Sequence, residues 1–352
     1  ELSQLDLAIV LAAGEGTRMK STRAKVLHEI AGRSLIGHVL HAVQSVKPKE
    51  LRVVIGASKD EVITHLSTIA PSATTVHQEV RGGTGHAVRI ALETFTGSGA
   101  VLVCAGDTPL LRGATLEKLL ASHNSSQSSA TVLTTIMPDP SGYGRVIREE
   151  DESLAKIVEE RDANQEEKET LEINSGVYIF ELADLVSAIT RLTSQNSQKE
   201  EYLTDVISIL KKDGKKVSAL LTDDFTEVLG VNDRSQLSVC TYVMHSRINE
   251  ALMLSGVSFV DPMSTWVDIT AEIDVDVRIE PGCAIKGKTK IGKSAVIGAR
   301  TTLIDCEVGS GAHVLESHCE SSVIGSGATV GPFAHLRGGT VLASNVKVGS
   351  FV

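Results

Sequence analysis

A glycine turn followed by a cluster of basic side chains stands near the start of the chain. Gly14 and Gly16 lack a Cβ, so their backbone N–H groups are open to close approach by a ligand. Four basic residues then fall within eight positions, namely Arg18, Lys20, Arg23 and Lys25. Because free amides and clustered positive charge both favour anions, we expect this segment to bind a polyphosphate.

The elements around this turn predict a parallel sheet. Residues 7–11 form an apolar run that is too short to cross a membrane and suits a buried strand. Alternating patterns continue to residue 110, with strands expected at 51–55, 74–77 and 100–104 and helices at 35–45, 59–69 and 85–95. Ligands collect at the carboxyl ends of such strands, where Gly14, Gln78 and Asp107 stand.

Other phosphate motifs fit the chain poorly. A dinucleotide fingerprint needs a third glycine where Met19 stands and a later acidic residue, and residues 33–43 contain none. Residues 287–294 match a P-loop by letter, but no strand precedes them and no helix follows, so we interpret the match as coincidence. From the residues alone, an ordinary strand–turn–helix corner with a solvated basic helix start remains an alternative for residues 7–25.

Composition narrows the class of protein. The 352 residues are 42% hydrophobic and only 3% aromatic, which suits cores of aliphatic side chains in two or more domains. A net charge of −10 disfavours a nucleic-acid partner. The five cysteines are scattered, which indicates a reducing compartment without a zinc site. We find no signal segment and no membrane-length apolar run, and we expect a cytoplasmic protein without a membrane partner.

The last third of the chain is periodic. Aliphatic residues recur every six positions from Val267 to Leu303 and, after an interruption, from Ile324 to Val348. This hexapeptide pattern is typical of a parallel β-helix, in which equivalent side chains stack from coil to coil. Three hexapeptides a coil would give five coils over residues 263–352. The chain stops inside the pattern, and we expect the natural protein to continue past Val352.

These patterns predict an α/β fold class with two domains and a connection. We expect a Rossmann-like domain with a mainly parallel sheet at residues 1–229. Residues 230–262 read as a linker with a connecting helix, placed at about residues 234–254. Residues 263–352 are expected to form a parallel β-helix.

Nine motifs resemble one family along the whole chain. They are Leu11-Ala-Ala-Gly-Glu-Gly-Thr-Arg-Met19, Ala24-Lys-Val-Leu27, Gly83-Thr-Gly-His-Ala87, Gly106-Asp-Thr-Pro-Leu110, Gly142-Tyr-Gly-Arg145, Ile157-Val-Glu159, Ile173-Asn-Ser-Gly176, Tyr202-Leu-Thr-Asp205 and Gly230-Val-Asn-Asp-Arg234. Followed by a hexapeptide tail, they resemble the bifunctional bacterial N-acetylglucosamine-1-phosphate uridyltransferase / glucosamine-1-phosphate acetyltransferase family. The opening motif together with the tail is far more specific than either part. The resemblance implies that residues 1–229 are a nucleotidyltransferase domain and that the parallel β-helix of residues 263–352 is left-handed.

The resemblance implies transfer of UMP from UTP to N-acetylglucosamine 1-phosphate, giving UDP-N-acetylglucosamine for cell-wall peptidoglycan and releasing pyrophosphate. It implies Mg²⁺ held by Asp107 and Asn232, and catalysis by Arg18, Lys25 and Asp107. Nucleotide contacts would come from Leu11, Ala12, Ala13, Gly14, Lys25, Gln78, Gly83, Thr84, Ala105, Gly106 and Asp107. The sugar substrate would contact Gly144, Glu159, Asn174 and Asn232. Outside the resemblance, Glu159 in its acidic run would be read as solvent-facing.

The family also has an acetyltransferase site between the β-helices of a homotrimer. Arg337 matches a substrate-binding arginine of that site, whereas its catalytic histidine would lie beyond Val352. We therefore expect a trimer through the β-helix, and acetyl transfer from acetyl-CoA only in a longer chain.

Two departures and two alternatives stay open. Ala24 and the first glycine of Leu336-Arg-Gly-Gly339 stand where the family usually has proline. A glucose- or mannose-1-phosphate nucleotidyltransferase would share the opening motif and sometimes the hexapeptide tail. A non-catalytic regulatory subunit would share the fold, although the presence of Arg18, Lys25 and Asp107 argues against a dead enzyme.

Overall fold

The computed structural model describes residues 5–352, which form two compact units. Unit 1 contains the chain up to His28 together with Ser34–Gln236, and unit 2 contains Glu29–Arg33 and Leu237–Val352. Within residues 5–352, no helix is both long and apolar enough to span a membrane. All five cysteines are buried, and none of them forms a disulfide within residues 5–352.

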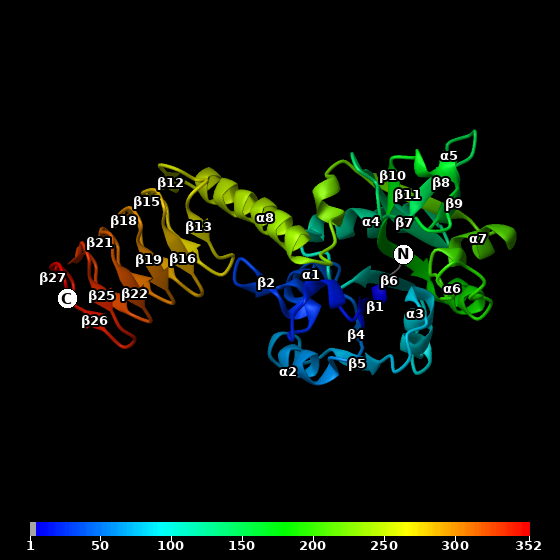
Figure 1. Cartoon of the computed structure of the whole chain (residues 1–352), viewed down its shortest axis with the longest axis horizontal. Coiled ribbons are helices and arrows are strands. Elements are labelled where there is room, and N and C mark those ends of the chain that lie inside the picture. The colour runs from blue at the N-terminus through cyan, green and yellow to red at the C-terminus, as the bar shows by residue number, and fades with distance from the viewer. Residues whose placement is uncertain (1–4) are drawn as a thin grey trace. The chain divides into compact units, whose positions relative to one another are not determined.

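Unit 1 is built on a nine-stranded sheet with the path β11-β7-β10-β6-β1-β4-β5 (Figure 1). Its parallel part comprises β1 (Leu5–Ala12), β4 (Glu50–Ile55), β5 (Thr74–His77) and β6 (Ala100–Ala105). The remainder comprises β7 (Ala130–Ile136), β8 (Arg145–Arg148), β9 (Leu154–Val158), β10 (Glu172–Glu181) and β11 (Val217–Thr222), in which β10 runs antiparallel to β6 and β7. The parallel strands bring their carboxyl ends to one edge.

Helices cover both faces of this sheet because successive strand residues alternate between two cores. Ala8 and Val10 of β1 face one core, whereas Leu7 and Ile9 face the other. The first core is closed by α1 (Leu35–Gln44), α2 (Lys59–Ile69) and α4 (Gly113–Ser126). The second is closed by α3 (Thr84–Leu92), α6 (Leu182–Ile189) and α7 (Asp205–Lys212).

Short elements complete the chain before the β-helix. They are η1 (Thr17–Met19), η2 (Lys25–Leu27), the hairpin strands β2 (Glu29–Ile30) and β3 (Arg33–Ser34), α5 (Gln165–Lys168) and η3 (Phe225–Val228). Helix α8 (Arg234–Leu254) follows, with the bounds expected from the sequence. In α8, Asn249 donates to the carbonyl oxygens of Pro262 and Thr265 at 2.8 and 2.9 Å, which ties the helix to the chain entering the β-helix.

Unit 2 continues as a parallel β-helix of three sheets, whose strands run from yellow to red in Figure 1. The first sheet contains β12 (Ser258–Phe259), β15 (Arg278–Ile279), β18 (Val296–Ile297), β21 (His313–Val314), β24 (Thr329–Val330) and β27 (Lys347–Val348). The second contains β13 (Trp266–Val267), β16 (Ala284–Lys286), β19 (Thr302–Ile304), β22 (His318–Glu320) and β25 (His335–Leu336). The third contains β14 (Glu272–Ile273), β17 (Lys290–Ile291), β20 (Glu307–Val308), β23 (Val323–Ile324) and β26 (Val341–Leu342).

The interruption in the hexapeptide pattern consists of shortened turns and not of a break in the fold. The spacing between stacked residues drops from six to five before Val308, Cys319 and Ile324. Cys319 stacks on Leu303 and Leu336 in the core and is fully buried. A cysteine therefore occupies a core position that aliphatic residues hold in the other coils, so a pattern of aliphatic residues alone does not include it.

The fold class predicted from the sequence is confirmed. The sheet of unit 1 is mainly parallel in its first half, and the strands at 74–77 and the helix at 59–69 lie where the pattern placed them. The P-loop-like residues 287–294 contain β17 and belong to the β-helix, as the rejection of that motif requires.

Candidate active site

An open pocket of about 220 Å³ lies at the carboxyl edge of the unit 1 sheet. Because β1, β5 and β6 are parallel members of one sheet, the residues after them converge there. The pocket is lined by eight of the residues predicted for the nucleotide, namely Leu11, Ala13, Gly14, Gln78, Gly83, Thr84, Ala105 and Asp107. Of the others predicted, Ala12 is buried and Gly106 donates its N–H to the carbonyl oxygen of Leu11 at 2.9 Å.

Lys25 binds two residues that come from distant parts of the chain. Its Nζ lies 2.5 Å from Oδ2 of Asp107 and 3.1 Å from Oδ1 of Asn232. The backbone holds the two acceptors together, because the N–H of Val231 donates to the carbonyl oxygen of Asp107 at 2.9 Å. The side chains of Lys25 and Asp107 are 10% and 22% exposed, so the ion pair is shielded but still reached by solvent. One cation therefore already sits between a carboxylate and an amide oxygen.

The donor set at this point suits a hard divalent cation. The oxygens of Asp107 and Asn232 converge on a single positive centre, the Lys25 ammonium. Mg²⁺ prefers oxygen ligands and keeps several waters, so two protein oxygens at a solvent-accessible edge are enough to hold it. The residues that the sequence predicted as metal ligands thus fit a magnesium ion.

The loop that carries Lys25 is shaped by Gly16 and Ala24. Gly16 has φ of 64°, and a Cβ built there would lie 2.7 Å from Cβ of Lys25, so only glycine fits. The N–H of Ala24 donates to Oε1 of Glu61 in α2 at 2.6 Å. Proline, which the family usually has at this position, has no N–H and cannot make that bond. The hydrogen bond compensates locally for the missing ring.

Gln78 is oriented by His86, a residue to which the sequence analysis gave no role. Nε2 of Gln78 lies 2.8 Å from Nδ1 of His86 and 3.4 Å from the carbonyl oxygen of Gly83. The amide nitrogen is therefore occupied, whereas no described residue bonds Oε1. This arrangement leaves an acceptor for the base of a nucleotide.

Gly144, Glu159 and Asn174 form a second group of polar residues. The N–H of Asn174 donates to the carbonyl oxygen of Gly144 at 2.9 Å. A Cβ on Gly144 would stand 3.5 Å from Oε2 of Glu159, so the glycine leaves the carboxylate open on that side. Oε1 of Glu159 accepts from Oγ1 of Thr204 at 3.3 Å. Three of the residues predicted for the sugar are thus brought together, whereas the fourth, Asn232, lies at Lys25.

Burial changes the electrostatics of this second group. Loss of solvent raises the pKa of Glu159, and the negative charges of Asp205 and Asp162 raise it further against the hydrogen bond from Thr204. Burial also raises the pKa of Asp205, and Asp162 adds to that rise. Glu159 is therefore not the freely solvated carboxylate that its acidic run suggested.

Two predicted residues lie apart from these groups, and several lining residues were missed. Arg18, in η1, is exposed, and its side chain forms no hydrogen bond or ion pair with another residue of 5–352. Arg337 follows β25 in unit 2 and is exposed. The pocket also touches Arg81, Ala87 and Glu200, for which the sequence analysis proposed no role. Arg81 and Glu200 lie in loops and Ala87 lies on α3, and none of them belongs to a periodic pattern of polar residues. Only Arg81, a basic residue beside two glycines, indicates anion binding from the sequence.

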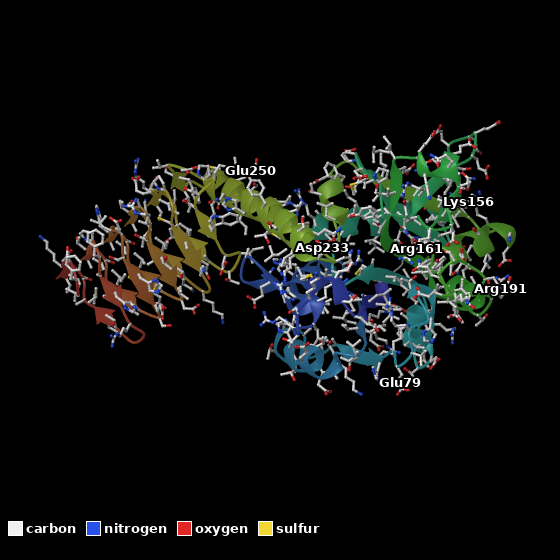
Figure 2. The ribbon with its side chains drawn as sticks, in the orientation of Figure 1. Glu79, Lys156, Arg161, Arg191, Asp233 and Glu250 are labelled. Carbon is white, nitrogen blue, oxygen red and sulfur yellow. The ribbon has the colours of Figure 1, made fainter. Side chains whose placement is uncertain are left out.

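Charged side chains outside these groups project from the surface, as Figure 2 shows for Glu79, Lys156 and Arg191. All three are exposed. They fit the solvated faces expected of an acidic protein.

Comparisons with known proteins agree with the two-part organisation. A family model described as the MobA-like NTP transferase domain matches residues 8–169, and one described as the GMPPB C-terminal domain matches residues 266–352. Curated relatives called bifunctional protein GlmU match nearly the whole chain. The one from Thermobifida fusca is 48% identical over 349 residues, or 98% of this chain and 72% of the relative.

Two further relatives with the same name have similar coverage. The Mycolicibacterium smegmatis protein is 46% identical over 350 residues, or 98% of this chain and 73% of its own length. The Streptomyces avermitilis protein is 44% identical over 347 residues, or 98% and 72%. The resemblance stated from the motifs is therefore confirmed: the chain belongs to the GlmU family of bifunctional proteins and is a nucleotidyltransferase.

Proposed function

We propose that unit 1 transfers UMP from UTP to N-acetylglucosamine 1-phosphate with Mg²⁺, giving UDP-N-acetylglucosamine and pyrophosphate. The observation that carries the proposal is the convergence of Lys25, Asp107 and Asn232 beside the pocket. This arrangement offers one mobile ammonium and two oxygen ligands at the place where a triphosphate and a sugar phosphate would meet.

The chemistry needs no protein base. A phosphate monoester has a second pKa of about 6, so the attacking oxygen of the sugar phosphate is already ionised at neutral pH. That oxygen forms a bond to the α-phosphorus of UTP, and the bond from this phosphorus to the bridging oxygen breaks. The electron pair leaves with pyrophosphate. The protein has to align the two phosphates and stabilise the charge that develops.

Lys25 is the residue that we place at the α-phosphate. To reach a phosphate oxygen, its ammonium has to leave Asp107 and Asn232, which frees both oxygens for the metal ion. A Mg²⁺ ion held by Asp107 and Asn232 would supply positive charge to the substrate phosphates. Arg18, exposed in η1, would contact the leaving pyrophosphate, and the Gly14 backbone would lie against the nucleotide.

Gln78 would recognise the base, and the group of Gly144, Glu159 and Asn174 would recognise the sugar. Oε1 of Gln78 is an acceptor suited to the N3–H of uracil, and cytosine offers no donor at that position. Gly144, Glu159 and Asn174 offer backbone and side-chain acceptors for the hydroxyl and N-acetyl groups of the hexosamine. Each assignment keeps the role that the sequence resemblance implied.

The decisive experiment measures pyrophosphate release with UTP, dTTP, GTP and ATP, each paired with N-acetylglucosamine, glucose and mannose 1-phosphates. We expect turnover with UTP and N-acetylglucosamine 1-phosphate that requires Mg²⁺ and exceeds every other pair. A preference for another nucleotide or sugar would favour the alternative nucleotidyltransferases. Lack of turnover with all pairs would favour the regulatory subunit.

For unit 2 we propose the assembly role that the resemblance implies. The aliphatic stacks make the β-helix a rigid support, and a homotrimer through this part is the expected assembly. Arg337 would contact glucosamine 1-phosphate in the acetyl-transfer activity of the longer protein. Light scattering at micromolar concentration tests the trimer, and a monomer would contradict it. A cytoplasmic location stays a prediction.

A further inference from the structure

Three side chains with metal-ligating groups stand together on the second sheet of the β-helix. His318, Glu320 and His335 each offer one donor atom, and these atoms all lie within 4.8 Å of one another. The proposed transfer reaction uses none of the three. Within residues 5–352, no other group of three His, Cys, Asp or Glu side chains meets this distance.

The β-helix itself places these donors side by side. His318 in β22 and His335 in β25 are direct partners in a parallel register, so equivalent positions of successive coils both carry imidazole. Cys319 and Leu336, the next residues along each strand, point into the core and are 0% and 5% exposed. Because side chains alternate along a strand, His318 and Glu320 emerge on the same outer face. The core thus fixes the backbones beneath the three donors.

The side chains are already in contact with one another. Nε2 of His318 lies 2.7 Å from Oε1 of Glu320, and the rings of His318 and His335 meet edge to face with centroids 5.4 Å apart. Zinc–ligand bonds are about 2.0–2.2 Å long for imidazole nitrogen and carboxylate oxygen, so rotation of these exposed side chains is enough to close the donors on one ion. No backbone movement is needed.

We propose that His318, Glu320 and His335 bind one divalent transition-metal ion of the Zn²⁺ class. Two imidazoles and a carboxylate select such ions over Mg²⁺, which prefers oxygen ligands alone. Three protein ligands leave a fourth position open to water or to an exogenous ligand. The bound ion joins two successive coils, and it therefore stabilises the folded β-helix.

The test uses the whole untagged chain with excess Mg²⁺, which occupies oxygen-only sites. Co²⁺ is added and its visible absorption is followed, with Zn²⁺ as the competitor. The variants are His335→Ala and Glu320→Gln, and His313→Ala is the control because His313 is an exposed histidine on β21 of another sheet. Thermal unfolding with and without Zn²⁺ gives a second measurement.

We expect one Co²⁺ for each chain, displaced by Zn²⁺, and a higher unfolding temperature with Zn²⁺. His335→Ala and Glu320→Gln should each weaken Co²⁺ binding by at least about tenfold, the lower range seen when only an outer partner of a metal ligand is lost. His313→Ala should bind as the unchanged chain does. Equal Co²⁺ binding by all four chains, or an absence of bound Co²⁺, would overturn the proposal.

Discussion

The sheet of unit 1 and the sheets of the β-helix both contain parallel strands, but these strands bring different kinds of residues together. In unit 1, parallel strands end on different polar residues, so that Gly14, Gln78 and Asp107 meet at one pocket. In the β-helix, equivalent positions repeat, so that Ile285, Leu303 and Cys319 stack in one core. The ends of neighbouring strands therefore bring different polar residues together, whereas the stacked strands of the β-helix place similar apolar residues in a row. The first arrangement suits chemistry and the second suits support.

Substitutions should therefore separate activity from stability according to which sheet they affect. A change at the carboxyl edge of unit 1 should reduce turnover and leave unfolding nearly unchanged. A change in the β-helix core should do the reverse.

The largest effect on activity is expected for Asp107→Ala. This variant loses a metal oxygen and the partner of Lys25, and turnover should fall at least about 100-fold, as when a preorganised charge-stabilising group is removed. Pyrophosphate release measures turnover, and circular dichroism measures folding. Asp223→Ala, at an exposed acid, is the control. Normal turnover of Asp107→Ala would remove the metal assignment.

The opposite behaviour is expected for Ile297→Ala in β18. The side chain is fully buried, and its truncation should lower the free energy of unfolding by about 2–5 kcal/mol. Turnover of the folded protein at low temperature should stay the same. Val341→Ala, whose residue is 71% exposed in β26, should change unfolding by less than about 0.5 kcal/mol. Equal urea midpoints for the two variants would contradict the contrast between the sheets.

Lys25→Met tests whether the ammonium and the metal ion share one place. Methionine keeps an unbranched stem beside Gly16 and removes the charge, so transition-state stabilisation should fall by about 2–4 kcal/mol. Without nucleotide, Mn²⁺ should bind more tightly, because Asp107 and Asn232 no longer hold a cation. Paramagnetic resonance of free Mn²⁺ measures this binding. Arg18→Met should lower turnover with unchanged Mn²⁺ affinity. If Lys25→Met bound Mn²⁺ no more tightly than the unchanged chain does, the ammonium and the metal ion would not share one site.

His86→Ala sharpens the account of base recognition. Without the imidazole, the Gln78 amide loses its partner at 2.8 Å and its orientation. The KM for UTP should rise roughly fivefold, the value of one ordinary hydrogen bond, and the preference for UTP over CTP should narrow. His77→Ala, at an exposed histidine ending β5, is the matched control. An unchanged UTP-to-CTP ratio would show that another group reads the base.

A pH-dependent effect on stability is expected for Glu159→Gln. Burial raises the pKa of Glu159 above the value of about 4.3 for a free glutamate, so the folded protein holds this proton more tightly than the unfolded chain. The carboxylate therefore costs stability as pH rises through its folded pKa. Glu159→Gln should unfold at a higher temperature than the unchanged chain at neutral pH, and the difference should vanish in acid.

The same variant should bind the sugar phosphate less well. A hydrogen bond to a charged acceptor is lost, and the KM for N-acetylglucosamine 1-phosphate should rise roughly tenfold. Glu150→Gln, at an exposed glutamate of the same acidic run, is the control for the sugar measurement. If Glu159→Gln were less stable at every pH, the electrostatic account of its burial would be wrong.

The fold was predictable where side chains repeat with a fixed period. Strands of aliphatic residues and the six-residue spacing follow from local pattern, and they placed Gly14 and Asp107 at the correct edge. The roles of Lys25 and Asn232 came from the resemblance, since no local pattern links residues 207 positions apart.

The rest depends on contacts that no local pattern contains. Glu159 lies in an acidic run, and its pKa is raised by burial and by the charge of Asp205, far along the chain, although the hydrogen bond from Thr204 lowers it. His86 stands eight residues from Gln78, across a loop whose path is not periodic. Burial of an ionisable group is a property of the assembled fold, so these roles needed the structure.

The hydrogen bond from Ala24 to Glu61 has a consequence for how such chains diverge. A proline at position 24 would restrain the approach to Lys25 through its own ring and would need no partner at position 61. Where alanine takes its place, restraint is shared with a carboxylate on another helix. The two positions therefore act together, and Ala24→Pro alone would remove the N–H and leave Glu61 without its amide partner.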